Sequence, residues 1–406
     1  MPDALRLPAA PARALAGLGA LLLAALPAFM AAANRSSPLV VGVAGLAFLA
    51  AALAVEGRAA AIGLLRPLAT PLGLASLAFL GWCGLSLAWT SQPALWGRTA
   101  AEFLPALAGA ALVARLAPPH LGADLRPALW LLAAAGAYVV ADIAADLIVQ
   151  RVLGLRVADF IFNRTSVTLL VVMVPLAALA WARGLRGLAL VGLVAGAAAV
   201  TRAASAAALL GLVVAALTYG MARVLPRAGL ALAGLGLLGA LALSPVEGDL
   251  LARAMPEALH QRLSGSSSHA RVAIARAFGA AVAEDPWRGA GFGTSGRFEA
   301  VPTAQRLDPD FRAMLAVGHP HNSFLQVWAE LGLVGACLAA TVIALCLRAL
   351  AGWPPPARAA ALALIAGAAA VAFVGHGAWQ GWWIASLGAA VAWLRAMRHS
   401  PGPSSG

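Results

Sequence analysis

The sequence predicts an all-α integral membrane protein with about 12 transmembrane helices and one long loop outside the membrane. Of its 406 residues, 62% are hydrophobic and only 11% are charged, whereas a soluble domain carries roughly 25% charged residues. The apolar residues gather in runs of about 20, which is the length that a helix needs to cross a bilayer. This composition excludes a soluble enzyme, a disordered chain and a disulfide scaffold.

Runs of this length, bounded by arginine, proline or polar clusters, predict the individual helices. The first run follows Arg6 and Arg13 and is long enough to span a bilayer, so we interpret it as a helix and not as a signal peptide. Only Thr201 and Arg202 separate the seventh run from the eighth, and a Gly-His-Gly turn separates the last two. The expected helices cover residues 14–33, 38–55, 70–89, 99–117, 127–149, 164–182, 187–201, 203–222, 227–244, 322–347, 358–376 and 378–397.

The 28 basic residues, all of them arginine, predict which way the chain crosses the membrane. Cytoplasmic loops retain positive charge. With the amino terminus inside, 14 arginines fall in cytoplasmic segments, six in short outer loops and eight in the long segment 245–321. We therefore expect both termini in the cytoplasm and the long segment outside. The net charge of +12 is explained in this way, and nucleic acid is not an expected partner.

These patterns divide the chain into four parts. Residues 1–244 hold the first nine helices, 245–321 form the outer loop, 322–397 hold the last three helices, and 398–406 form a tail expected to be disordered in the cytoplasm. Within the loop, residues 269–283 show apolar positions at helical spacing, which predicts an amphipathic helix on the membrane surface.

The residues with the clearest chemical potential lie where the outer loop enters the tenth helix. His319 and His321 are expected near water, where a neutral imidazole can act as a general base on a hydroxyl, with Asn322 orienting the ring. The alternative is that both histidines cap the helix at the level of the lipid headgroups. Further along the same helix, Gln326 and Glu330 are polar at membrane depth, which indicates a functional site or a Glu330 paired with an arginine in a cavity.

Three arginines are expected on the same outer side: Arg164, Arg202 and Arg271. A guanidinium group binds phosphate through paired hydrogen bonds, so these side chains suit a pyrophosphate, although arginines also reach lipid phosphates. No cofactor is expected, and no pattern of metal ligands stands out except Asp308 and Asp310, where a turn cap competes with a metal site.

Together these features resemble the O-antigen ligase and polymerase superfamily. The resemblance is carried by Pro320 to Gln326 running into Glu330 to Gly335, by the turn-rich residues 286–293, and by residues 89–93 after the third helix. It implies a GT-C-like, metal-independent enzyme that takes a glycan from undecaprenyl pyrophosphate at the periplasmic face of the bacterial inner membrane. The acceptor is the lipid A core in the ligases and a second lipid-linked repeat unit in the polymerases.

The resemblance also assigns residues. The essential histidine of the family falls on His321, and its two arginines fall on Arg271 and Arg202; a further phosphate-side arginine falls on Arg164. We therefore expect His321, Arg271 and Arg202 to be catalytic. The substrate-binding candidates are Arg164, His319, Asn322, Arg288, Gln326 and Glu330.

A ligase is the favoured reading because the sequence contains only one long outer loop. A polymerase is the main alternative, and a transferase that attaches glycans to protein is a lesser one. A transporter or flippase would also have about twelve helices with polar residues inside the membrane. Against a transporter, the polar residues here gather at one face and not near the midplane.

Overall fold

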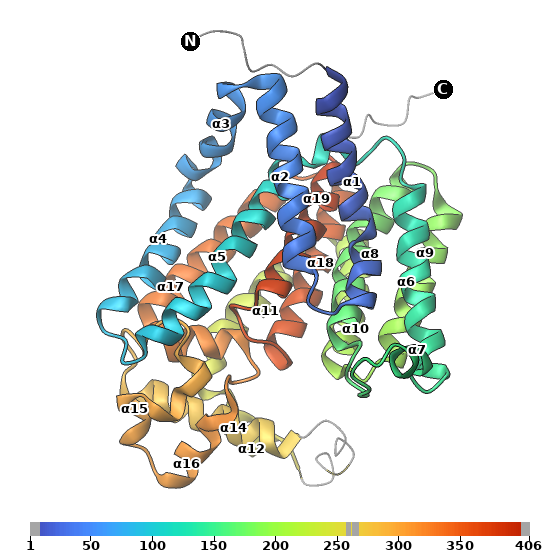
Figure 1. Ribbon diagram of the computed structural model, residues 1–406. Coiled ribbons are helices and arrows are strands. Elements are labelled where there is room, and N and C mark those ends of the chain that lie inside the picture. Colours follow the sequence, from blue (N-terminus) through green and yellow to red (C-terminus); the bar gives the residue numbers. More distant parts are fainter. Residues whose placement is uncertain (1–8, 257–260, 262–267, 399–406) are drawn as a thin grey trace.

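The computed structural model describes residues 9–256, 261 and 268–398. Arg6 and the expected tail from residue 399 lie outside the described residues. The described chain forms one bundle of long helices whose two described ends lie at the same end of the bundle (Figure 1). A group of short helices covers the opposite end. Helices are the only regular elements among the described residues, which confirms the all-α class.

Each expected run contains a helix. The long helices are α1 (Ala9–Ala32), α2 (Ser37–Glu56), α4 (Pro71–Leu85), α5 (Pro93–Leu116), α6 (Arg126–Ala144), α8 (Asn163–Ala182), α9 (Arg186–Arg202), α10 (Ala206–Val224), α11 (Pro226–Leu243), α17 (Ser323–Ala351), α18 (Pro355–Val374) and α19 (Gly381–Ala396). The short helices α3 (Arg58–Leu65) and α7 (Ile148–Val152) lie at opposite ends of the bundle (Figure 1).

Ten helices of the described chain are long and apolar enough to cross a membrane. Helices α9 and α19, with 17 and 16 residues, are not among them, whereas α4 reaches the required length together with the turn that follows it, as Pro71–Ala88. The expected number of twelve spans is therefore not confirmed, although the molecule is an all-helical integral membrane protein.

Small residues let the central helices approach closely. Helix α8 is buried over most of its length and contacts α9, α18 and α19. At the contact between α19 and α5, a Cβ atom added to Gly388 would lie only 2.4 Å from the Cβ of Ala110. A larger residue would therefore clash and push the two helices apart. Close approach stabilises the bundle because helices in lipid associate mainly through van der Waals packing.

The segment after α11 forms a helical subdomain at one end of the bundle. It contains α12 (Glu247–Ala254), α14 (Ser268–Glu284), α15 (Pro302–Gln305) and α16 (Pro309–Met314). The expected loop helix is present as α14, but its apolar side is buried in protein, with Phe278 packed 4.9 Å from Phe298. The apolar side of α14 packs against other residues of the loop and of α17, which together form a small hydrophobic core. We expected this side to lie on the membrane surface. Asp308 caps α16 by accepting a hydrogen bond from the backbone N–H of Asp310 (2.9 Å).

Candidate functional site

Helix α17, which leads from the subdomain into the bundle, is broken at Gly332. The backbone there has φ 62° and ψ −164°, a left-handed conformation that favours glycine. The turn-rich segment 286–291 supplies the hydrogen bonds that the break removes. The backbone N–H of Gly291 donates to the carbonyl of Glu330 (2.7 Å), and the N–H of Leu333 donates to the carbonyl of Pro286 (2.7 Å).

The side chain of Glu330 lies at this break and is fully buried. Its carboxylate accepts four hydrogen bonds. The indole Nε1 of Trp379 (2.7 Å), the amide Nε2 of Gln326 (2.9 Å) and the backbone N–H groups of Ser295 (3.1 Å) and Gly293 are the donors. No arginine of the described chain pairs with it, so the expected alternative of a Glu330–Arg pair is not what the structure contains.

Gln326 and Asn322 extend this network toward the start of α17. The Gln326 carbonyl oxygen accepts from the N–H of Ala378 (2.8 Å), which ties α17 to the turn between α18 and α19. Asn322 is the N-cap of α17, because its oxygen accepts from the N–H of Phe324 (2.8 Å), and its Nδ2 donates to both carboxylate oxygens of Glu247 (2.7 Å each). Both side chains are almost completely buried, so their polar groups are used within the protein.

The two expected histidines lie side by side just before this cap. The rings of His319 and His321 are 4.3 Å apart between centroids, and the backbone N–H of His321 donates to Nδ1 of His319 (3.1 Å). His321 has φ 55°, which is uncommon for a residue other than glycine and is maintained by its surroundings. The helix cap is Asn322, so neither histidine performs the capping role considered from the sequence.

A third histidine, His376, belongs to the same cluster and was not singled out from the sequence. It lies in the turn between α18 and α19, where its ring contacts that of Trp382 at 5.0 Å between centroids. Its Nε2 is buried and has no hydrogen-bond partner within the described chain. The only sequence signal was the Gly375 to Gly377 turn, which predicts a helix boundary but not a buried imidazole.

Two of the expected arginines approach this histidine cluster. The guanidinium carbon of Arg164, from the first turn of α8, lies 5.4 Å from the centre of the Trp382 ring. Arg271, from the first turns of α14, is half-buried and close enough to His321 to affect its protonation. The cluster therefore combines two cationic side chains with three imidazoles, drawn from four separate parts of the chain.

All three imidazoles are held in the neutral form at pH 7. Burial and the positive charge of Arg271 lower the pKa of His321, and a hydrogen bond to the backbone of Gly375 opposes this shift. Burial and His321 lower the pKa of His319 to about 4. Burial, with His319, Arg164 and His321, lowers the pKa of His376 to about 4. A neutral imidazole can accept a proton, so the cluster suits general base chemistry.

The structure does not bring Arg202 and Arg288 into this cluster. Arg202 is the exposed last residue of α9. Arg288 is also exposed, pairs with Asp285 (3.4 Å) and lines a small pocket of about 100 Å³ together with Trp89 and Thr303. Within the described residues, no contact joins either side chain to the histidines.

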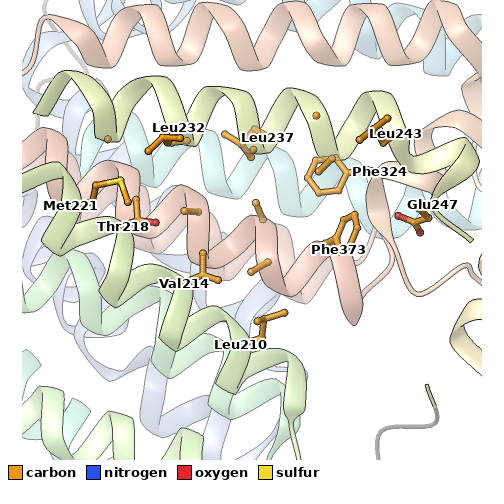
Figure 2. Close-up of a pocket in the computed structure, with 18 of the residues that line it drawn as sticks. Leu210, Val214, Thr218, Met221, Leu232, Leu237, Leu243, Glu247, Phe324 and Phe373 are labelled. Atoms are coloured by element: carbon orange, nitrogen blue, oxygen red, sulfur yellow. The ribbon is translucent and has the colours of Figure 1, made fainter. Parts of the chain in front are cut away.

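An apolar groove of about 510 Å³ lies between α10, α11 and α18. Figure 2 shows Glu247 at one end of it, beside Phe324 and Phe373, with Met221 toward the other end. Because Glu247 holds Asn322, and Asn322 directly follows His321, this end of the groove lies next to the histidine cluster. A long apolar chain could occupy the groove while its polar end reaches the cluster.

Comparison with known proteins adds one match. Residues 187–340 match the family model described as O-Antigen ligase. The matched range covers Arg202, Arg271, His319 and His321 and ends within α17, after the break at Gly332. No curated protein matches the chain.

The buried carboxylate of Glu330 gives a first prediction. Replacing Glu330 by Gln keeps the volume but places an amide NH₂ group against hydrogen-bond donors, so we expect a loss of roughly 2–4 kcal/mol of stability. Thermal unfolding of the purified protein in detergent measures this loss. The matched control is Glu56→Gln, an exposed glutamate at the last position of α2. Equal unfolding temperatures for the two variants would contradict the anchoring role.

Proposed function

We propose that the protein is an O-antigen ligase, a proposal supported by the match of residues 187–340 to the family model described as O-Antigen ligase. In this proposal it transfers a glycan from undecaprenyl pyrophosphate to a sugar of the lipid A core of lipopolysaccharide, without a metal ion. The observation that carries the proposal is the cluster of imidazoles around His321, whose ring lies 4.3 Å from that of His319 between centroids, with Arg271 near His321 and Arg164 near His376.

The proposed reaction is a direct displacement at the anomeric carbon of the donor. Neutral His321 accepts the proton of the acceptor hydroxyl while the acceptor oxygen forms a bond to the anomeric carbon. The bond between that carbon and the pyrophosphate oxygen breaks, and the configuration inverts. Arg271 and Arg164 stabilise the negative charge that develops on the departing pyrophosphate.

The remaining expected residues take supporting roles in this proposal. Asn322, Gln326 and Glu330 position the loop that carries His321, since their polar atoms are bonded within the protein. Arg202 and Arg288 are proposed to contact the donor or the acceptor glycan from the rim, because both are exposed.

The apolar groove between α10, α11 and α18 is the proposed site of the polyprenyl chain. It has an apolar lining, and its end at Glu247 adjoins the histidine cluster. We further propose that the protein lies in the bacterial inner membrane with the histidine cluster facing the periplasm and both termini in the cytoplasm. The distribution of arginines supports this orientation.

Removal of the proposed base tests the function. Purified protein is incubated with the undecaprenyl-pyrophosphate glycan and a lipid A core acceptor in a chelating buffer, and the mass of the lipopolysaccharide product is measured. His321→Ala should reduce the rate by about 10²- to 10⁴-fold, the contribution of a general base. His120→Ala, at the opposite end of the bundle, is the control.

Other products would redirect the proposal. A lengthened lipid-linked glycan would indicate a polymerase, and glycan attached to protein would indicate a protein glycosyltransferase. No covalent product from a folded protein would favour a transporter. Normal transfer by His321→Ala would remove His321 from the mechanism.

The pH dependence of the rate provides a second test. A general base works only when unprotonated, so the rate should fall on the acid side as His321 gains a proton. Burial and Arg271 lower the pKa of His321 from its ordinary value of 6.5, so the midpoint of this fall should lie below pH 6.5. Arg271→Gln removes one of these causes, so the midpoint should move to higher pH. Arg276→Gln, on the same helix but exposed and paired with Asp249, should leave it unchanged.

His376 gives a third test. His376→Phe keeps a ring against Trp382 but removes the unpartnered Nε2. If that nitrogen accepts a hydrogen bond from a substrate hydroxyl, the rate should fall at least about tenfold while the unfolding temperature stays the same or rises. Unchanged rates in this variant would mean that His376 only fills space.

A further inference from the structure

Another cavity, lined by charged and apolar residues, lies at the other end of the bundle from the histidine cluster. It has a volume of about 730 Å³ and is lined by residues of α1, α2, α3, α5 and α19, including Arg13 and Arg395 near the described ends of the chain. Three arginines line it, Arg13, Arg115 and Arg395, together with Glu56 and His120. Nothing in the proposed glycan transfer uses this cavity.

Two of these arginines, Arg115 and Arg395, are not paired with a carboxylate of the described residues. Arg115 donates one long hydrogen bond to the carbonyl of Gly63 (3.4 Å). The charges that act most on Arg395 are Arg115 and Arg398, both of them positive. Like charges repel when brought together in a partly dry site, so this arrangement favours an anion between them.

The rest of the cavity wall is apolar. Phe48 is buried and stacks on His120 at 5.6 Å between ring centroids, and Ala16 and Ala51 continue the wall. Burial lowers the pKa of His120, so this side chain is uncharged at pH 7. The cavity thus offers guanidinium groups beside an apolar surface, which suits a phosphate carried on a larger molecule.

We propose that this cavity binds a phosphate group, with Arg115 and Arg395 as its principal ligands. A guanidinium group presents paired N–H donors that match two phosphate oxygens, and two such groups can hold one phosphate from both sides. The phosphate belongs either to a phospholipid headgroup or to a free phosphate compound. This site is independent of the proposed glycan transfer.

The test measures binding of two probes to the purified full-length protein. Native mass spectrometry counts the phosphatidylglycerol molecules retained from mixed micelles, with phosphatidylcholine, whose headgroup carries no net charge, as the reference lipid. Isothermal calorimetry measures binding of inorganic pyrophosphate in micelles without anionic lipid. The double variant Arg115→Gln/Arg395→Gln keeps much of each side chain but removes both charges. The matched control is Arg348→Gln, an arginine in the last turn of α17 that does not line the cavity.

We expect the double variant to weaken binding of at least one probe about tenfold or more, while Arg348→Gln binds as the wild type does. Loss of phosphatidylglycerol binding alone assigns the site to a lipid headgroup, and loss of pyrophosphate binding alone assigns it to a free phosphate compound.

If the double variant does not fold, Arg115→Lys/Arg395→Lys keeps both charges without the paired donors, and weaker binding in it supports the site. Binding by neither probe, or equal binding in the cavity variants and in Arg348→Gln, would overturn the proposal. Transfer activity should be retained in the cavity variants, which separates this site from the proposed function.

Discussion

The architecture of the candidate site depends on one buried carboxylate. Glu330 sits where α17 is broken, and it accepts hydrogen bonds from the 293–295 turn, from its own helix and from Trp379 after α18. An ionisable group at this depth is costly unless it is fully hydrogen-bonded. Two of the donors on Glu330 belong to elements next to the histidine cluster, since Trp379 follows the turn that carries His376 and Gln326 lies in the helix that begins after His321. Satisfying this one group therefore fixes the relative positions of three segments that are distant in the sequence.

The polar residues spaced along the start of α17 form a connected set. Asn322 ends the loop and joins it to α12, Gln326 joins α17 to the α18–α19 turn, and Glu330 joins both to the 293–295 turn. Gly332 then permits the backbone of residues 286–288 to approach, since a Cβ atom there would lie 2.4 Å from the carbonyl oxygen of Trp287. The spacing that resembles the family is thus the spacing of successive contacts that fix the start of α17, the helix that begins directly after His321 and Asn322.

Apolar periodicity predicted the helices because the requirement for about 20 apolar residues is local. The helix in the outer loop was predicted for the same reason, but its burial was not, because the residues that cover it come from the 3-10 helix η6 (Thr294–Ala300), from α16 and from α17. Of the expected site residues, Arg164, Arg271, His319 and His321 lie together, whereas Arg202 and Arg288 lie apart. The sequence predicts on which side of the membrane a residue lies, and therefore only its position along the membrane normal. It does not predict which side chains lie next to one another in the plane of the membrane. His376 was missed because burial of a polar turn residue is decided by tertiary contacts that leave no periodic trace.

The break in α17 also has a consequence for how the chain is made. The turn at residues 286–295 leaves the ribosome before α17, yet the groups that receive its hydrogen bonds belong to Ala329 and Glu330. The subdomain therefore cannot reach its final form until α17 has been synthesised and has crossed to it. Trp379 arrives later still and supplies the last donor to Glu330. Domains fold largely in the order of synthesis when their contacts are local; here, a ribosome-bound chain that ends before residue 379 would still lack the partner that completes its own broken helix.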